Sequence, residues 1–262
     1  MSSDDIGSVL NEEALRSKTI HGKWHPEYLA LSYRSAAALA LAVVRGGRPR
    51  VLKTDLWNEC LGGNRDIVHH LQETTGCTVV AVDVALSICA QGRALVPRAY
   101  VVQADIRALP FRSGSFDAVL DLSTLDHLQD SAVAEAIGEY RRVLRRAGVL
   151  LLVFWQRNAL IRLRLFLKRL LGRREKPGQH YLARADVRAW LGDGLQVVIE
   201  FVAGVLLTPP QRLTGLVLGR LTSARLTRIL RWLVGVEQFG TAHPVLKHLA
   251  GLYGIVVLRR DD

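Results

Sequence analysis

Four aspartates stand at the ends of four short apolar segments that the sequence predicts to be β-strands. They are Asp55, Asp83, Asp105 and Asp121. Because ligands of open parallel sheets bind beyond the carboxyl ends of the strands, we expect these carboxylates to line one site. A carboxylate at the tip of the second strand can accept hydrogen bonds from both hydroxyls of a ribose. Asp83 has that position, although it could also cap a helix that starts near Ala85.

A histidine and an aspartate follow the fourth predicted strand. His127 can take a proton from a hydroxyl or an amine near neutral pH, and Asp126 can orient its ring. Each also has a structural interpretation, His127 as a helix-start or packing residue and Asp126 as a helix cap. The pair is the candidate general base of the chain.

Short apolar segments alternate with helical segments in the first two thirds of the chain. The expected strands are 51–55, 78–84, 99–105, 116–122 and 149–155, and the expected helices are 33–44, 64–75, 86–92 and 131–146. This alternation implies parallel pairing through right-handed crossovers, and therefore a doubly wound α/β sheet.

After Trp155 the alternation becomes irregular. The sequence predicts a basic helix over 158–171, a helix capped near Asp186, and strands over 196–202 and 254–259. A stretch rich in leucine and arginine, from about 210 to 236, separates the last two strands.

The composition limits the class of protein and its partners. The chain has 262 residues, a formal net charge of +11 and three cysteines. The charge favours anionic partners such as nucleic acid, phosphorylated compounds or acidic lipid headgroups. Three cysteines without a Cys-x-x-Cys pair indicate neither a disulfide framework nor a zinc site, so we expect no metal. No secretion signal or apolar run of spanning length is visible, which predicts a cytoplasmic protein and leaves open a peripheral position at the inner membrane face.

Several spaced motifs between Asp105 and Arg157 agree with a single family. In order they are Asp-Ile-Arg-Ala-Leu-Pro-Phe from Asp105, Ser-Phe-Asp-Ala-Val-Leu-Asp-Leu from Ser115, Leu-Asp-His-Leu from Leu125, and Glu-Tyr-Arg-Arg-Val-Leu from Glu139. This passage resembles the middle of class I S-adenosylmethionine-dependent methyltransferases of the type 11-like group. The resemblance covers about 51–157 well and the last strand loosely, and it implies a Rossmann-like sheet of seven strands and S-adenosylmethionine as cofactor.

The resemblance also implies a domain organisation. We expect a helical cap over 1–50, a Rossmann-like core formed by 51–157 and 196–262, and helical elaborations of the same domain over 158–195 and 203–250.

Cofactor-binding roles follow from the resemblance, position by position. Asp83 would bind the ribose, Asp105 the adenine amino group, and Ile106 would supply a backbone amide and an apolar wall. Asp121, Leu122 and Ser123 would lie beside the methionine part and the reacting centre.

The first loop departs from the family pattern. Family members carry a Gly-x-Gly-x-Gly loop after the first strand, where the backbone approaches the cofactor closely. This chain instead has Lys53, Thr54, Asp55 and Glu59 there, and its glycines come only at 62 and 63. Either Asp55 or Glu59 accepts the ammonium group of the cofactor in a variant loop, or the chain has lost cofactor binding.

Aromatic and basic residues before the first strand are candidates for substrate contacts. In similar enzymes the amino-terminal helices fold over the cofactor and the substrate, which would place Trp24, His25, Tyr28 and Tyr33 at the lid of the pocket. The alternative is a helix that only packs against the sheet. Basic amphipathic helices over 158–173 and 220–233 suit an anionic membrane or an amphiphilic substrate, and they equally suit ordinary surface helices.

The sequence therefore favours methyl transfer from S-adenosylmethionine to a small, apolar or amphiphilic metabolite, with oxygen as the favoured acceptor atom. A methyltransferase-like protein that is catalytically silent and serves as a binding or scaffold partner is the alternative. An RNA methyltransferase ranks lower, because the arginines alternate with leucines rather than with stacking aromatics and no nucleic-acid-binding module is visible.

Overall fold

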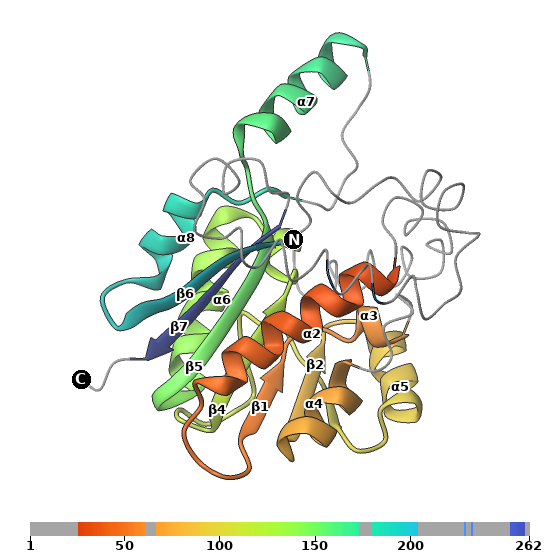
Figure 1. Cartoon of the computed structure of the whole chain (residues 1–262), viewed down its shortest axis with the longest axis vertical. Helices are drawn as coiled ribbons and strands as arrows, with labels where there is room; N and C mark the ends of the chain where they lie inside the picture. Colours follow the sequence, from red (N-terminus) through yellow and green to blue (C-terminus); the bar gives the residue numbers. More distant parts are fainter. Residues whose placement is uncertain are drawn as a thin grey trace.

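A single sheet of seven strands organises the protein. The computed structural model describes residues 26–60, 67–172, 180–203, 228, 232 and 252–259. The strands run in the spatial order β3-β2-β1-β4-β5-β7-β6. Their bounds are β1 Arg50–Lys53, β2 Thr78–Asp83, β3 Tyr100–Gln103, β4 Phe116–Leu122, β5 Leu144–Trp155, β6 Leu195–Ala203 and β7 Leu252–Arg259. Figure 1 shows these strands as one twisted layer between helices.

The first five strands are parallel, and β7 runs antiparallel to both of its neighbours, β5 and β6. The predicted α/β fold class with a doubly wound seven-stranded sheet is therefore confirmed. The strand order reverses between β1 and β4, because the chain moves outward from β1 to β3 and then returns to start β4 beside β1. In such sheets this reversal point is where a ligand binds.

Helices cover both faces of the sheet (Figure 1). Their bounds are α2 Pro26–Ala42, α3 Trp57–Cys60, α4 Ile67–Thr75, α5 Leu86–Leu95, α6 Asp130–Val143, α7 Ala159–Leu170 and α8 Arg184–Leu191. One apolar core lies between the sheet and α2, α4 and α5, and a second lies between the sheet and α6 and α8. Successive strand residues point to opposite faces, so Val51 belongs to the first core and Leu52 to the second.

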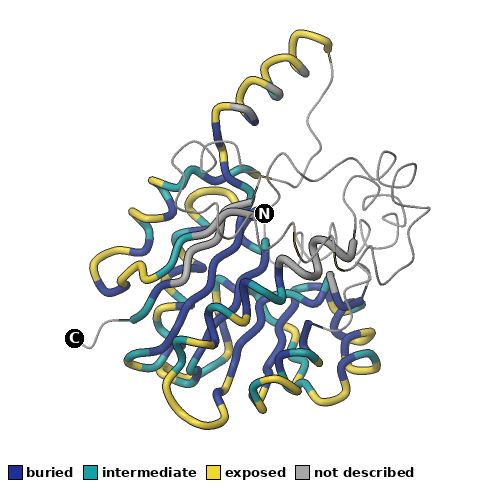
Figure 2. The backbone as a smooth tube through the Cα atoms, viewed as in Figure 1, coloured by how far each residue is buried: buried dark blue, intermediate teal, exposed yellow. Residues whose placement is uncertain are grey.

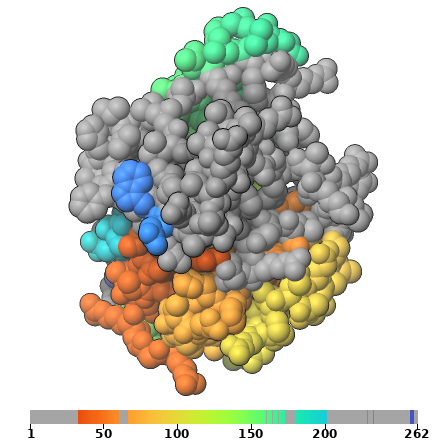
Figure 3. All heavy atoms as spheres, turned by 45° about the vertical axis from the view of Figure 1, so that its right-hand side comes forward, coloured from red at the N-terminus to blue at the C-terminus, as the bar shows by residue number. Residues whose placement is uncertain are grey.

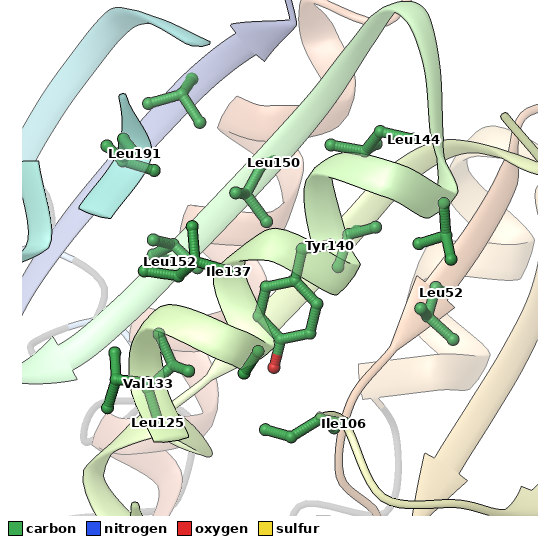
Figure 4. Close-up of a cluster of buried hydrophobic side chains, with 14 of the residues drawn as sticks. Leu52, Ile106, Leu125, Val133, Ile137, Tyr140, Leu144, Leu150, Leu152 and Leu191 are labelled. Atoms are coloured by element: carbon green, nitrogen blue, oxygen red, sulfur yellow. The ribbon is translucent and has the colours of Figure 1, made fainter. Parts of the chain in front are cut away.

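The second core contains Tyr140, a large and fully buried side chain of α6. Figure 4 shows its ring among Ile137, Leu150 and Leu152, with the hydroxyl at one end of the ring. Strands β1, β2, β4 and β5 are mostly buried, and Figure 2 shows the middle of the sheet in dark blue. The core therefore holds a polar hydroxyl, which needs a hydrogen-bond partner.

Several expected element bounds differ in the structure, among them those of β5 and of the helix near Asp186. Strand β5 begins at Leu144, five residues before the expected Val149, because Leu144 already pairs with Phe116 across an irregularity in the register. Asp186 does not cap the helix near it: α8 begins at Arg184 without a side-chain capping bond, and Asp186 lies in the first turn with its Oδ2 3.0 Å from Arg157 Nη2. The expected helices between β6 and β7 lie outside the described residues, apart from Arg228 and Trp232.

Candidate active site

The end of β1 carries a buried ion cluster formed by Lys53, Asp55 and Glu59. The Lys53 side chain is fully buried; its Nζ lies 3.1 Å from Glu59 Oε2 and 3.5 Å from Asp55 Oδ2, and it also donates to the Asp55 carbonyl. Burial lowers the pKa of Lys53, but the two carboxylates outweigh this effect and raise it to about 12. Lys53 therefore stays charged in the interior.

Glu59 has an oxygen atom without a hydrogen-bond partner in this cluster. Burial raises the pKa of its carboxyl to about 7, against the opposing effect of Lys53. Its Oε1 atom is buried and has no hydrogen-bond partner among the described residues. A carboxylate oxygen in this state can accept a donor from a bound cationic group.

Asp83 ends β2 and is tied to the loop after β1. Its Oδ2 accepts the backbone N–H of Leu56 at 3.1 Å, and its Oδ1 accepts the backbone N–H of Ala85 at 2.9 Å. Burial raises its pKa to about 6, although these two hydrogen bonds oppose the rise. A carboxylate has about four lone-pair sites, so two bonds leave capacity for ligand hydroxyls.

Asp121 lies near the end of β4, fully buried. Tyr140 Oη donates to its Oδ2 at 2.7 Å, which satisfies the hydroxyl in the core, and the backbone N–H of Thr124 donates to its Oδ1 at 2.9 Å. Burial raises the pKa of Asp121 to about 6. The hydroxyls of Thr54 and Thr124 lie 2.9 Å apart and join the ends of β1 and β4.

Asp126 connects the ends of β4 and β5. Its Oδ1 accepts the backbone N–H of Trp155 at 2.9 Å, its Oδ2 accepts Ser123 Oγ, and its carbonyl accepts the backbone N–H of His180 at 2.6 Å. Burial raises its pKa to about 8. The short 3-10 turn Leu125–His127 has no side-chain cap, so the capping role offered for Asp126 is wrong, and its carboxylate holds the strand ends instead.

Tyr33 of α2 reaches the same edge of the sheet. It is 5% exposed, and burial together with the charges of Asp126 and Asp55 raises its pKa above the usual value, while a hydrogen bond with Ser123 opposes the rise. Of the four predicted substrate residues, Tyr33 is thus brought to the site. Trp24 and His25 lie outside the described residues, as does the side chain of Tyr28.

Asp105 follows β3 and is paired with a neighbour. Arg107 Nε donates to both of its oxygens at 3.0 Å. Burial raises the pKa of Asp105, but the hydrogen bonds and charge of Arg107 outweigh it and hold the pKa below its usual value. Ile106 is 7% exposed and packs in the second core, as an apolar wall would.

Two further predicted site residues, His127 and Leu122, differ in their exposure. His127 is exposed at the end of the turn that follows β4. Leu122 is 1% exposed and packs into the first core, so its side chain points away from the edge. Only the backbone of Leu122 could contact a ligand there.

The electrostatic couplings show that the carboxyl groups converge. The charge of Asp55 raises the pKa of Glu59, of Asp83 and of Asp121, and Asp121 in turn raises that of Asp126. Five carboxyl groups and one ammonium therefore share the reversal point of the sheet. Although the whole chain is basic, this edge is acidic, and it suits a cation such as a sulfonium or an ammonium.

Sequence reasoning missed Arg107, Thr124 and Tyr140 as residues of this edge. A tyrosine within the apolar stripe of a predicted helix was a usable signal, because a buried hydroxyl requires a partner. The position of Thr124, two residues after the end of β4, was a weaker signal. Ser123 has a φ of 75°, a left-handed conformation that is uncommon for residues other than glycine.

Comparison with known proteins agrees with this topology. Residues 60–152 match the family model described as a methyltransferase domain. A malonyl-[acyl-carrier protein] O-methyltransferase from Enterobacter lignolyticus is 40% identical over 78 residues, which cover 29% of this chain and 29% of the relative. An S-adenosylmethionine-dependent methyltransferase of Mycobacterium tuberculosis is 37% identical over 73 residues, covering 28% of this chain and 26% of the relative. The alignments thus span less than a third of these curated relatives.

Solved structures share the fold at low identity. A SAM-dependent methyltransferase from Methanosarcina mazei superposes with a TM-score of 0.56 at 13% identity, over 85% of this chain and 97% of that one. The [4+2]-cyclase SpnF superposes with a TM-score of 0.55 at 18% identity, over 87% and 81%. Residues 60–152 therefore match a methyltransferase domain, and the chain shares the fold of S-adenosylmethionine-dependent methyltransferases of known structure.

Proposed function

We propose that this protein binds S-adenosylmethionine at the carboxyl edge of β1, β2 and β4 and transfers its methyl group to a small, apolar or amphiphilic acceptor, with oxygen as the favoured acceptor atom. The observation that carries the proposal is the cluster of five carboxyl groups and one ammonium at the strand-order reversal. A positively charged cofactor fits this acidic edge.

The cofactor side is assigned to residues already at this edge. Asp83 has lone pairs left for the ribose hydroxyls, and Asp55 and Glu59 are placed to accept an ammonium group, with Lys53 and Thr54 fixing the loop around them. Bound S-adenosylmethionine supplies a methyl carbon activated by a sulfonium, so the protein has mainly to align the nucleophile. Asp105 and Ile106 would hold the adenine. This requires Asp105 to share its oxygens with Arg107.

The acceptor side is assigned to the end of β4 and to α2. His127 is exposed there and can take the proton of an acceptor hydroxyl. Asp126 acts as a positioning residue, because its carboxylate holds Ser123 and Trp155. Tyr33, and with it Trp24, His25 and Tyr28, would cover the acceptor. The O-methyltransferase name of one relative supports oxygen as the acceptor atom.

Asp83→Ala should weaken the binding of S-adenosylmethionine about 10- to 150-fold, because the ribose loses hydrogen bonds to a charged acceptor worth about 1.5 to 3 kcal/mol. Titration calorimetry measures the change. The matched control is Asp193→Ala, which alters an exposed aspartate in the turn before β6 and should bind like the unmodified protein. Equal affinities of the two variants would remove the ribose assignment.

Asp55→Asn should also weaken cofactor binding, by about tenfold, without unfolding the protein. The amide keeps the shape of the side chain and can still accept the backbone N–H of Trp57, but it loses the charge that would attract the ammonium group. Circular dichroism checks the fold and calorimetry the affinity. An unchanged dissociation constant would exclude Asp55 as the ammonium acceptor and leave Glu59.

A catalytically silent binding protein is the second candidate, and the loop after β1 favours it. Both oxygens of Asp83 already accept backbone donors, and the segment after β1 carries the bulky Trp57 and has no glycine before Gly62. A methyltransferase fold can also serve other chemistry, as the name of the [4+2]-cyclase shows for that protein. A protein that remains folded but binds no cofactor at millimolar concentration would support this candidate.

A further inference from the structure

Helix α7 projects from the body of the protein at the carboxyl end of β5. Figure 1 shows it extending away from the sheet. Asn158 starts the helix, since its Oδ1 accepts the backbone N–H of Ile161 at 2.8 Å. Ile161 is only 8% exposed, so the first turn is anchored while the following turns leave the core.

The outer side of this helix is apolar. Five large side chains on it are between 48% and 70% exposed. They are Leu163, Phe166, Leu167 and Leu170, together with Leu171 at the C-cap position directly after the helix. At about 100° per residue they share an arc of about 140°. Figure 2 shows most of α7 as exposed, and Figure 3 shows it as a ridge at the top of the molecule. We call these five residues the α7 apolar arc.

The apolar arc faces away from the side that holds the helix to the protein. Ile161 is buried and Leu165 is half-buried, and both fall about opposite the centre of the arc. A surface helix that packs only on its own core turns its wide apolar side inward and its charged side outward. Here the narrow apolar side faces the protein, and the wide one is exposed in the described part of the chain.

Basic residues border the arc on both sides. Arg162 and Arg169 occupy helix positions along one border, and Arg164 and Lys168 occupy positions along the other. No acidic residue occurs in α7. Within the described part of the chain no helix is long and apolar enough to cross a bilayer. An apolar arc bordered by cations on a short helix matches a surface whose headgroups are anionic and whose interior is apolar.

We infer that α7 is an interfacial helix that docks this protein on an anionic phospholipid bilayer. The apolar arc enters the boundary between headgroups and acyl chains, and the bordering cations contact the phosphates. The helix begins four residues after Trp155, whose backbone N–H is bonded to Asp126 of the candidate site. Docking therefore brings the acceptor edge close to the bilayer. That last consequence rests on the proposed function, whereas the docking itself does not.

Vesicle flotation of the full-length chain tests the inference. We expect the protein to float with vesicles of phosphatidylglycerol and phosphatidylcholine at low salt and to bind them several-fold less at high salt. With vesicles of phosphatidylcholine alone it should not float. Phe166→Glu with Leu170→Glu should weaken binding at least about tenfold, because two carboxylates enter the arc. The control is Leu86→Glu, which adds a charge at a leucine that is 56% exposed on α5, and it should bind normally.

Two outcomes would overturn the inference. One is a protein that stays behind with anionic vesicles at low salt, and the other is a loss of binding by Leu86→Glu equal to that of the double variant. The alternative partner of the arc is a second copy of the chain, which sedimentation without vesicles tests. If the unmodified protein is a dimer, the double variant is a monomer and neither binds vesicles, the arc serves self-association. Cofactor binding by the double variant should be unchanged, so failure of the proposed function and failure of docking are distinguishable.

Discussion

Replacing Lys53 with methionine should lower the free energy of unfolding by about 3 to 5 kcal/mol at pH 8.5, the cost of removing one partner from a buried ion pair. Methionine fills nearly the same space, so packing changes little. The loss is electrostatic: Glu59 Oε2 loses its 3.1 Å contact while its Oε1 already has no partner among the described residues. Chemical denaturation followed by circular dichroism measures it.

The pH dependence identifies the cause of this loss. Without the ammonium of Lys53 the pKa of Glu59 rises above its present value of about 7, so Glu59 takes up a proton near neutral pH and the penalty shrinks as the pH falls. The double variant Lys53→Met with Glu59→Gln should recover at least about 1.5 kcal/mol relative to the sum of the single changes. Additive effects of the two changes at pH 8.5 would show that the pair is not coupled.

The free energy of unfolding of the unmodified protein should fall by about 2 to 3 kcal/mol between pH 5.5 and pH 7.5 because of Asp126, and Asp126→Asn should remove this fall. The pKa of Asp126 is about 8 in the folded protein and near 3.8 in the unfolded chain, so the folded state keeps a proton that the unfolded state has released. Such a group stabilises the fold at low pH, and this stability is lost as the pH rises toward 8, by about 1.4 kcal/mol for each pH unit. Asparagine is neutral throughout.

The comparison that matters is between Asp126→Asn and the unmodified protein at each pH. The amide oxygen can still accept the backbone N–H of Trp155, and the amide nitrogen can donate to Ser123 Oγ, so the geometry is kept. The free energy of unfolding of the variant should therefore increase relative to that of the unmodified protein as the pH rises. A difference that is constant from pH 5.5 to 8.5 would show that Asp126 is ionised throughout that range.

The sequence predicts the middle of the fold well because local signals agree there. Strand β4 was expected over 116–122 and is observed over the same residues, since an apolar run lies between a turn at Gly114 and the polar Ser123. The alternation of strands and helices then determines which strand ends share an edge. Asp55, Asp83 and Asp121 could be assigned to one site for that reason.

What the sequence does not predict is how each carboxylate is satisfied. The partners of Asp83 include a backbone N–H that is 27 positions away, and those of Asp121 a tyrosine that is 19 positions away. These contacts depend on the distance between elements rather than on local propensity. The same holds for Asp126, whose carboxylate bonds to Ser123 and to the backbone of a strand 29 positions later.

The direct test of the central claim is titration calorimetry of the unmodified full-length chain with S-adenosylmethionine and with its demethylated product. The five carboxyl groups and one ammonium at the reversal point of the sheet predict saturable binding of one molecule of cofactor per chain. The account is contradicted if the protein is folded by circular dichroism and neither compound binds at millimolar concentration.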